Sequence, residues 1–189
     1  MTIKTILAFA KIDNKSKVSY KKIMKTDLYR RIKNYQEISR EVGELRKQGK
    51  AIVFVNGCFD VLHFAHALFL EKAKKFGNVL VVGIASDKVI KKVKGEMRPI
   101  YPEKIRAGLV ASLSVVDLVV IMKENLYHGV DFHKLIAKIK PDVMVLNDDN
   151  SDIPTTRRLV KKYGGQLRLV PRQHPTISTT TTIKKISEI

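Results

Sequence analysis

The chain has no tryptophan, a single cysteine and half as many acidic as basic residues. Of its 189 residues, 36 are Lys or Arg and 18 are Asp or Glu, so the formal net charge is +18. The single cysteine, Cys58, excludes an internal disulfide and is compatible with a reducing compartment. No apolar run approaches the ~18 residues that a transmembrane helix needs. We therefore expect a cytoplasmic protein, without a membrane partner, that binds anionic ligands.

The positive charge is distributed unevenly. Residues 1–33 contain 10 Lys or Arg and 2 Asp or Glu, a net charge of +8, which leaves +10 for the rest. We interpret residues 1–33 as a basic N-terminal extension, either solvated or acting as an arm that contacts a partner subunit or nucleic acid. Residues 34–189 are expected to form a single domain, because the chain is 44% hydrophobic, enough for a core.

Buried strands alternate with amphipathic helices along the expected domain. Short β-branched and apolar runs predict strands at residues 52–55, 78–85, 117–121, 143–146 and 166–170. Helical spacing of apolar residues predicts helices at residues 35–45, 61–76, 87–94, 102–113, 132–139 and 157–163, and from residue 178 onward. This alternation predicts an α/β fold with a doubly wound, mostly parallel sheet of about five strands.

The segment after the first predicted strand carries the strongest functional signal. Asn56-Gly57 ends the strand, and Asp60 is the expected N-cap of the next helix. His63 and His66 are three residues apart, so they point the same way in the first helical turn, at the carboxyl end of the sheet. A metal site would need a third ligand at suitable spacing. Phosphate is therefore the expected partner, because free helix N–H groups favour anions.

This segment resembles one enzyme family. Gly57-x-Phe59-Asp60-x-x-His63-x-x-His66 is similar to the HxGH signature of the cytidylyltransferase-like nucleotidyltransferases, which have a Rossmann-like α/β fold. The similarity continues in residues 91–100, 102–106, 116–117 and 177–180. The order and spacing of these blocks most resemble the nucleotidyltransferase half of bacterial ADP-heptose synthases, and the resemblance covers roughly residues 34–189.

The resemblance implies roles for residues that follow several of the predicted strands. The implied catalytic residues are His63, His66 and Lys94. The implied nucleotide-binding residues are Asn56, Gly57, Cys58, Phe59, Asp60, Lys91, Arg106, Ile177, Ser178, Thr179 and Thr180. Asp149 is the expected acceptor-binding residue. No residue is assigned as a metal ligand, and Mg²⁺ is expected to accompany the nucleoside triphosphate.

The sequence departs from the family pattern in two places. Ala65 stands where relatives have glycine. Leu146, Asn147 and Asp148 stand where relatives usually have a lysine and two glycines before the aspartate. The second departure removes one positive charge and adds a negative one near the expected acceptor, so the identity of the acceptor stays open.

The resemblance implies transfer of a nucleotidyl group from a nucleoside triphosphate, by analogy ATP, to a sugar or polyol phosphate with release of pyrophosphate. Two alternatives are a CTP-dependent cytidylyltransferase of the glycerol-3-phosphate type and an FMN adenylyltransferase. A protein that binds nucleotide or RNA without catalysis is compatible with Ala65 and the basic extension. Because relatives are commonly dimeric, we expect a homodimer.

Overall fold

The computed structural model describes residues 27–123, 130–172, 174 and 176–188, so most of the basic extension lies outside the described residues. The strands are β1 (Ile32–Lys33), β2 (Ile52–Gly57), β3 (Val79–Ala85), β4 (Leu118–Met122), β5 (Val143–Asn147) and β6 (Gln166–Val170). The helices are α3 (Asp27–Arg30), α4 (Tyr35–Lys47), α5 (Phe64–Lys74), α6 (Asp87–Lys94), α7 (Glu103–Ala111), α8 (Val130–Ile139), α9 (Ile153–Lys162) and α10 (Thr179–Ser187). The predicted alternation of strands and helices is confirmed.

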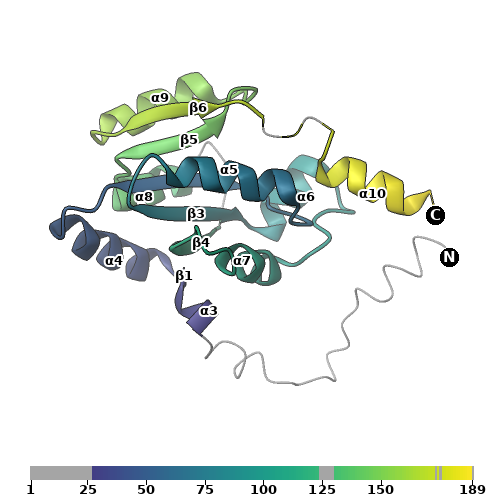
Figure 1. Ribbon diagram of the computed structural model, residues 1–189, viewed down its shortest axis with the longest axis horizontal. Coiled ribbons are helices and arrows are strands. Elements are labelled where there is room, and N and C mark those ends of the chain that lie inside the picture. The colour runs from purple at the N-terminus through teal and green to yellow at the C-terminus, as the bar shows by residue number, and fades with distance from the viewer. Residues whose placement is uncertain (1–26, 124–129, 173, 175, 189) are drawn as a thin grey trace.

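The strands form one parallel sheet in the order β1-β4-β3-β2-β5-β6 (Figure 1). Apart from β1, this is the order of a Rossmann-like, doubly wound sheet, as predicted. From β2 the chain first adds β3 and β4 on one side and later adds β5 and β6 on the other. The order therefore reverses between β2 and β5, and a crevice opens at the carboxyl ends of these two strands.

The sequence predicts about five strands, and the additional strand in the structure is β1. Its two residues pair with β4 at the edge of the sheet. Just before it, Nη1 of Arg31 donates a hydrogen bond to the backbone oxygen of Val116 at 2.9 Å. A strand of two residues has no periodicity to reveal it. The fold thus begins before Asn34, the residue at which the expected domain starts.

Helices cover both faces of the sheet and make two hydrophobic cores. Side chains alternate between the faces along a strand, so Ile52 and Phe54 of β2 lie in one core and Val53 and Val55 in the other. The first core contains buried residues of α4, α6, α8 and α9, and the second those of α5 and α7. These four side chains of β2 are fully buried, as the uninterrupted apolar run at residues 52–55 predicts.

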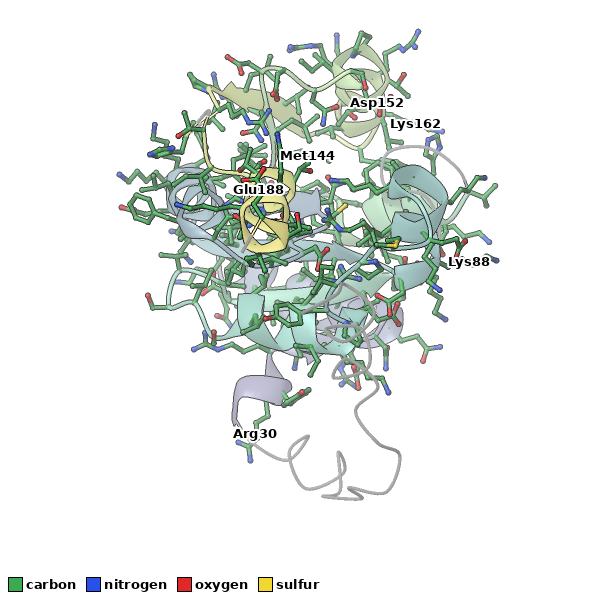
Figure 2. All side chains as sticks on the ribbon, turned by 90° about the vertical axis from the view of Figure 1, so that its right-hand side faces the viewer. Arg30, Lys88, Met144, Asp152, Lys162 and Glu188 are labelled. Carbon is green, nitrogen blue, oxygen red and sulfur yellow. The ribbon has the colours of Figure 1, made fainter. Side chains whose placement is uncertain are left out.

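Helix α10 lies beyond the ends of the strands (Figure 1). In the turned view of Figure 2 it is seen end-on in front of the sheet, with Glu188 at its end, Lys88 of α6 to one side and Lys162 of α9 above. The last helix therefore lies over the edge at which the crevice opens. Among the described residues, no helix is long and apolar enough to cross a membrane.

Candidate active site

A cavity of about 480 Å³ lies at the crevice between β2 and β5. Its walls come from the start of α5, the segment after β5 and the start of α10. A second cavity of about 310 Å³ adjoins it and is lined by the end of β2 and the loop that follows. The two cavities share six lining residues, which are His66, Phe69, Lys94, Asn147, Asn150 and Thr179. They are thus two parts of one site.

The structure brings His63 and His66 together. His63 is the N-cap of α5 and His66 its third residue, so the expectation that Asp60 is the N-cap is wrong. The two rings stack with centroids 3.7 Å apart and planes 21° from parallel. The backbone N–H of His63 donates to Nδ1 of His66 at 3.4 Å. Because Nδ1 accepts this bond, the proton of the neutral His66 ring is on Nε2.

Both histidines are held neutral. Burial, followed by the charges of His63 and Lys94, lowers the pKa of His66 to about 3, although the Asp60 carboxylate acts in the opposite direction. Burial and the charge of Arg172 lower the pKa of His63. The site therefore presents N–H donors from uncharged rings, beside the permanent charge of Lys94, to an anionic ligand.

Asp60 fixes the loop between β2 and α5. Its carboxylate, which is fully buried, accepts hydrogen bonds from Nε of Arg98 at 2.8 Å and from the backbone N–H groups of residues 100–101 at 3.0 Å. On either side, Phe59 and Val61 have positive φ angles of 48° and 46°. Such conformations are costly for these residue types and need support from the surroundings. Asp60 therefore shapes the loop, although it borders the second cavity.

Arg106, to which the resemblance assigns nucleotide binding, does not line either cavity. It is fully buried. Its guanidinium donates to the backbone oxygens of Cys58 at 2.6 Å, Ala85 at 2.7 Å and Tyr101 at 2.8 Å, and to Oδ1 of Asp87 at 2.8 Å. Arg106 therefore ties the ends of β2 and β3 to the loop before α7.

The two lysines of α6 that the resemblance singles out are placed differently. Lys94 lines both cavities. Lys91 lines neither, is exposed, and has its Nζ 3.7 Å from Oε2 of Glu96. The structure thus brings one of the two lysines to the site.

The start of α10 forms another wall of the first cavity, besides the one formed by the start of α5. Ser178 is the N-cap, and its Oγ accepts a hydrogen bond from the backbone N–H of Thr181 at 3.1 Å. Thr179 donates from Oγ1 to the backbone oxygen of Asp60 at 2.6 Å, which fastens the helix to the loop before α5. The lining includes every residue from Ile177 to Thr180. A second helix N-terminus thus faces the histidines.

The end of β2 supplies the wall of the second cavity, which Asn56, Gly57, Cys58 and Phe59 all line. A Cβ at Gly57 would lie 2.9 Å from the Phe59 ring, so glycine permits this turn. Burial raises the pKa of the Cys58 thiol, which therefore stays protonated, as expected for a small packed residue rather than a nucleophile.

Several lining residues were not predicted from the sequence. Asp149 lines the first cavity, as expected, but Arg172 lies there too, and its Nη1 is 3.1 Å from Oδ2 of Asp149. This wall also includes Asn147, the last residue of β5, and Asn150 and Ser151, which follow soon after it. Their place at the carboxyl end of a parallel strand could have predicted that they line the site. Arg172 lies in a segment without periodicity, so no sequence pattern points to it.

Among the described residues, no group of three or more His, Cys, Asp or Glu side chains could hold a metal ion. The site is instead built from histidine, lysine, hydroxyl and amide groups around two helix N-termini, a combination suited to a polyphosphate.

The fold and the site define a Rossmann-like protein whose histidine, lysine and helix N-termini meet at the point where the strand order reverses. Residues 54–185 match the cytidylyltransferase-like family model, and the chain belongs to that family. It is therefore a nucleotidyltransferase.

Two curated relatives carry the name bifunctional protein HldE. That of a Nitratiruptor species is 44% identical over 142 residues, which are 71% of this chain and 30% of that protein. That of Aliarcobacter butzleri is 41% identical over 164 residues, 83% of this chain and 31% of that protein. The chain thus spans about a third of the length of these relatives.

A solved structure agrees with the fold. The lipopolysaccharide core biosynthesis protein from Thermoplasma volcanium GSS1 is 31% identical with a TM-score of 0.54, and the match covers 66% of this chain and 97% of that chain. Pantoate-beta-alanine ligase from Francisella tularensis, at 19% identity and a TM-score of 0.56, shares the fold alone; the match covers 84% of this chain and 78% of that chain.

Proposed function

We propose that the chain transfers an adenylyl group from ATP to a sugar phosphate, as ADP-heptose synthases do, and releases pyrophosphate. The observation that carries the proposal is the stacked pair of His63 and His66, which lies with Lys94 in a cavity bordered by the N-termini of α5 and α10. Free N–H groups and helix dipoles at two N-termini favour a triphosphate. The similarity to the proteins named HldE supports this choice of reaction.

In the proposed reaction, an oxygen of the acceptor phosphate attacks the α-phosphorus of ATP. The bond between the α-phosphorus and the oxygen that bridges to the β-phosphorus breaks, and pyrophosphate leaves with that oxygen. The acceptor phosphate is already ionised, so no proton needs to be removed. Catalysis then depends on positioning and on neutralisation of charge.

Each lining group has a role in this reaction. Nε2–H of His66 and the His63 ring donate to the α- and β-phosphate oxygens, on which charge increases in the transition state. Lys94 adds a fixed positive charge. Ser178 and the first backbone N–H groups of α10, that of Thr179 included, hold the far end of the triphosphate, whereas the Thr179 hydroxyl stays bonded to the backbone oxygen of Asp60. Arg106 holds the loop beneath the nucleotide and does not contact it.

Magnesium enters this proposal with the nucleotide. The described residues contain no ready-made carboxylate cage, and Mg²⁺ commonly binds through substrate phosphates and water instead. The substrate is therefore Mg²⁺–ATP, whose metal neutralises part of the triphosphate charge. The chain's own residues act on the remaining charge.

The test is pyrophosphate release in the presence of Mg²⁺, with ATP or CTP crossed against heptose 1-phosphate, glycerol 3-phosphate and FMN. We expect turnover with ATP and heptose 1-phosphate. His66→Ala should lower kcat about 100-fold, as loss of one preorganised donor does. His133→Ala, at an exposed histidine of α8, should leave kcat unchanged. Wild-type turnover by His66→Ala would refute the role of the histidine pair.

A further inference from the structure

Asn147 carries an unused hydrogen-bond acceptor at the junction of the two cavities. It lines both of them. Its Oδ1 is buried and, within the part of the chain that the structure describes, has no hydrogen-bond partner. Buried polar atoms are nearly always paired in folded proteins, so an unpaired one on a residue that lines a cavity indicates a missing donor.

The fold explains why this side chain lies beside the histidines. β5 pairs with β2 in the register Val53 with Val143 and Phe54 with Met144, which brings Asn147 to the level of the end of β2. Val143 and Val145 belong to the core on the α5 side of the sheet. Because side chains alternate along a strand, Asn147 faces that same side, where α5 begins.

The chemistry of the amide oxygen selects its partner. A carbonyl oxygen is repelled by phosphate oxygens, so Oδ1 must face a donor rather than the phosphates that His66 and Lys94 attract. The wall on this side consists of Asp149, Asn150 and Ser151, which follow Asn147 in the chain. Asp149 and Ser151 line the first cavity only, whereas Asn150 lines both. That wall suits a polyhydroxylated molecule, and a hydroxyl group is the donor that such a molecule offers.

We infer that Asn147 is a specificity-determining residue that accepts a hydrogen bond from a hydroxyl of the acceptor, next to its attacking phosphate. The inference rests on the proposed function and narrows its acceptor to a phosphate ester with a neighbouring hydroxyl.

The experiment compares heptose 1-phosphate with its 2-deoxy analogue in wild type and Asn147→Ala. Wild type should prefer the hydroxylated acceptor about 10-fold in kcat/KM, which is the effect of one hydrogen bond. Asn147→Ala should lose this preference to within about twofold, with the KM for ATP unchanged. Asp148→Ala, an exposed neighbour that lines neither cavity, should keep the preference.

Binding measurements separate this inference from the proposed reaction. Calorimetry with α,β-methylene ATP and each acceptor reports the preference even without turnover. Selective binding without turnover would refute the reaction and keep the role of Asn147. The inference would be overturned if Asn147→Ala kept the preference or showed a raised KM for ATP instead. It would also be overturned if wild type had the same kcat/KM for both acceptors, or bound neither of them.

Discussion

His66 links the chemistry of the site to the stability of the fold. Its pKa is lowered from 6.5 to about 3, chiefly by burial. Below pH 6.5 the unfolded chain binds a proton at this residue, whereas the folded protein does not until the pH approaches 3. Because the unfolded state then holds more protons, acidification favours unfolding.

We predict that His66 alone lowers the free energy of unfolding by up to about 2 kcal/mol between pH 6.5 and pH 5. His66→Gln removes the titrating group and should flatten this decline. His133→Gln, at an exposed position, should not. Urea unfolding at the two pH values measures the difference, and equal declines in wild type and His66→Gln would contradict the assignment.

Arg106 is predicted to act on stability rather than on nucleotide contact. Arg106→Met leaves three backbone oxygens and Asp87 without their donor, so we expect a loss of about 3–5 kcal/mol in the free energy of unfolding. Arg157→Met, at an exposed site of α9, should change it by less than about 0.5 kcal/mol. Urea titration of both variants tests this, and an unaltered midpoint for Arg106→Met would contradict the structural role.

Residue patterns located the site better than they assigned individual roles. Two histidines at helical spacing after a strand were enough to predict that His63 and His66 converge, because local geometry fixes that. The partners of Asp60 and Arg106 come from residues 98–101 and from other strand ends, which no local signal connects to the motif. Their roles therefore required the tertiary structure.

At the scale of elements, α10 depends on its first turn. Of its residues only Thr179 is buried, and Oγ1 of Thr179 bonds to the backbone oxygen of Asp60. Thr179→Val keeps the shape and removes that bond. We expect the KM for ATP to rise about 10-fold, because the N-terminus of α10 is no longer held against the loop.

Thr182→Val serves as the matched control for this prediction, since Thr182 lies one turn further along α10 and lines neither cavity. Steady-state kinetics at saturating acceptor give both KM values. The same KM in all three proteins would mean that α10 does not bind the nucleotide.

The elements themselves were largely predictable. Five of the six strands have at least five residues and carry apolar residues that appear in the sequence pattern, whereas β1, with two residues, is too short to do so. The start of α5 was predicted three residues too early, because residues 61–63 form a loop that Asp60 shapes through distant contacts. Boundaries set by tertiary contacts are thus the part that sequence periodicity misses.

At the scale of the whole molecule, the excess positive charge is the feature that the reaction does not require. Residues 1–26 alone carry 7 Lys and 1 Asp, a net charge of +6. We predict that deleting them weakens binding to a single-stranded oligonucleotide and reduces its salt dependence, since fewer counterions are released. Pyrophosphate release should stay unchanged. Fluorescence anisotropy at several salt concentrations tests this, and an identical salt slope would contradict it.

The central claim is attack at the α-phosphorus of ATP, and radiolabelled ATP tests it most directly. With heptose 1-phosphate and Mg²⁺, label at the α-phosphate should appear in the sugar nucleotide, and label at the γ-phosphate should appear in pyrophosphate. His66→Ala should slow both together. Transfer of the γ-label to the sugar, or retention of both labels in ATP by folded wild-type protein, would contradict the account.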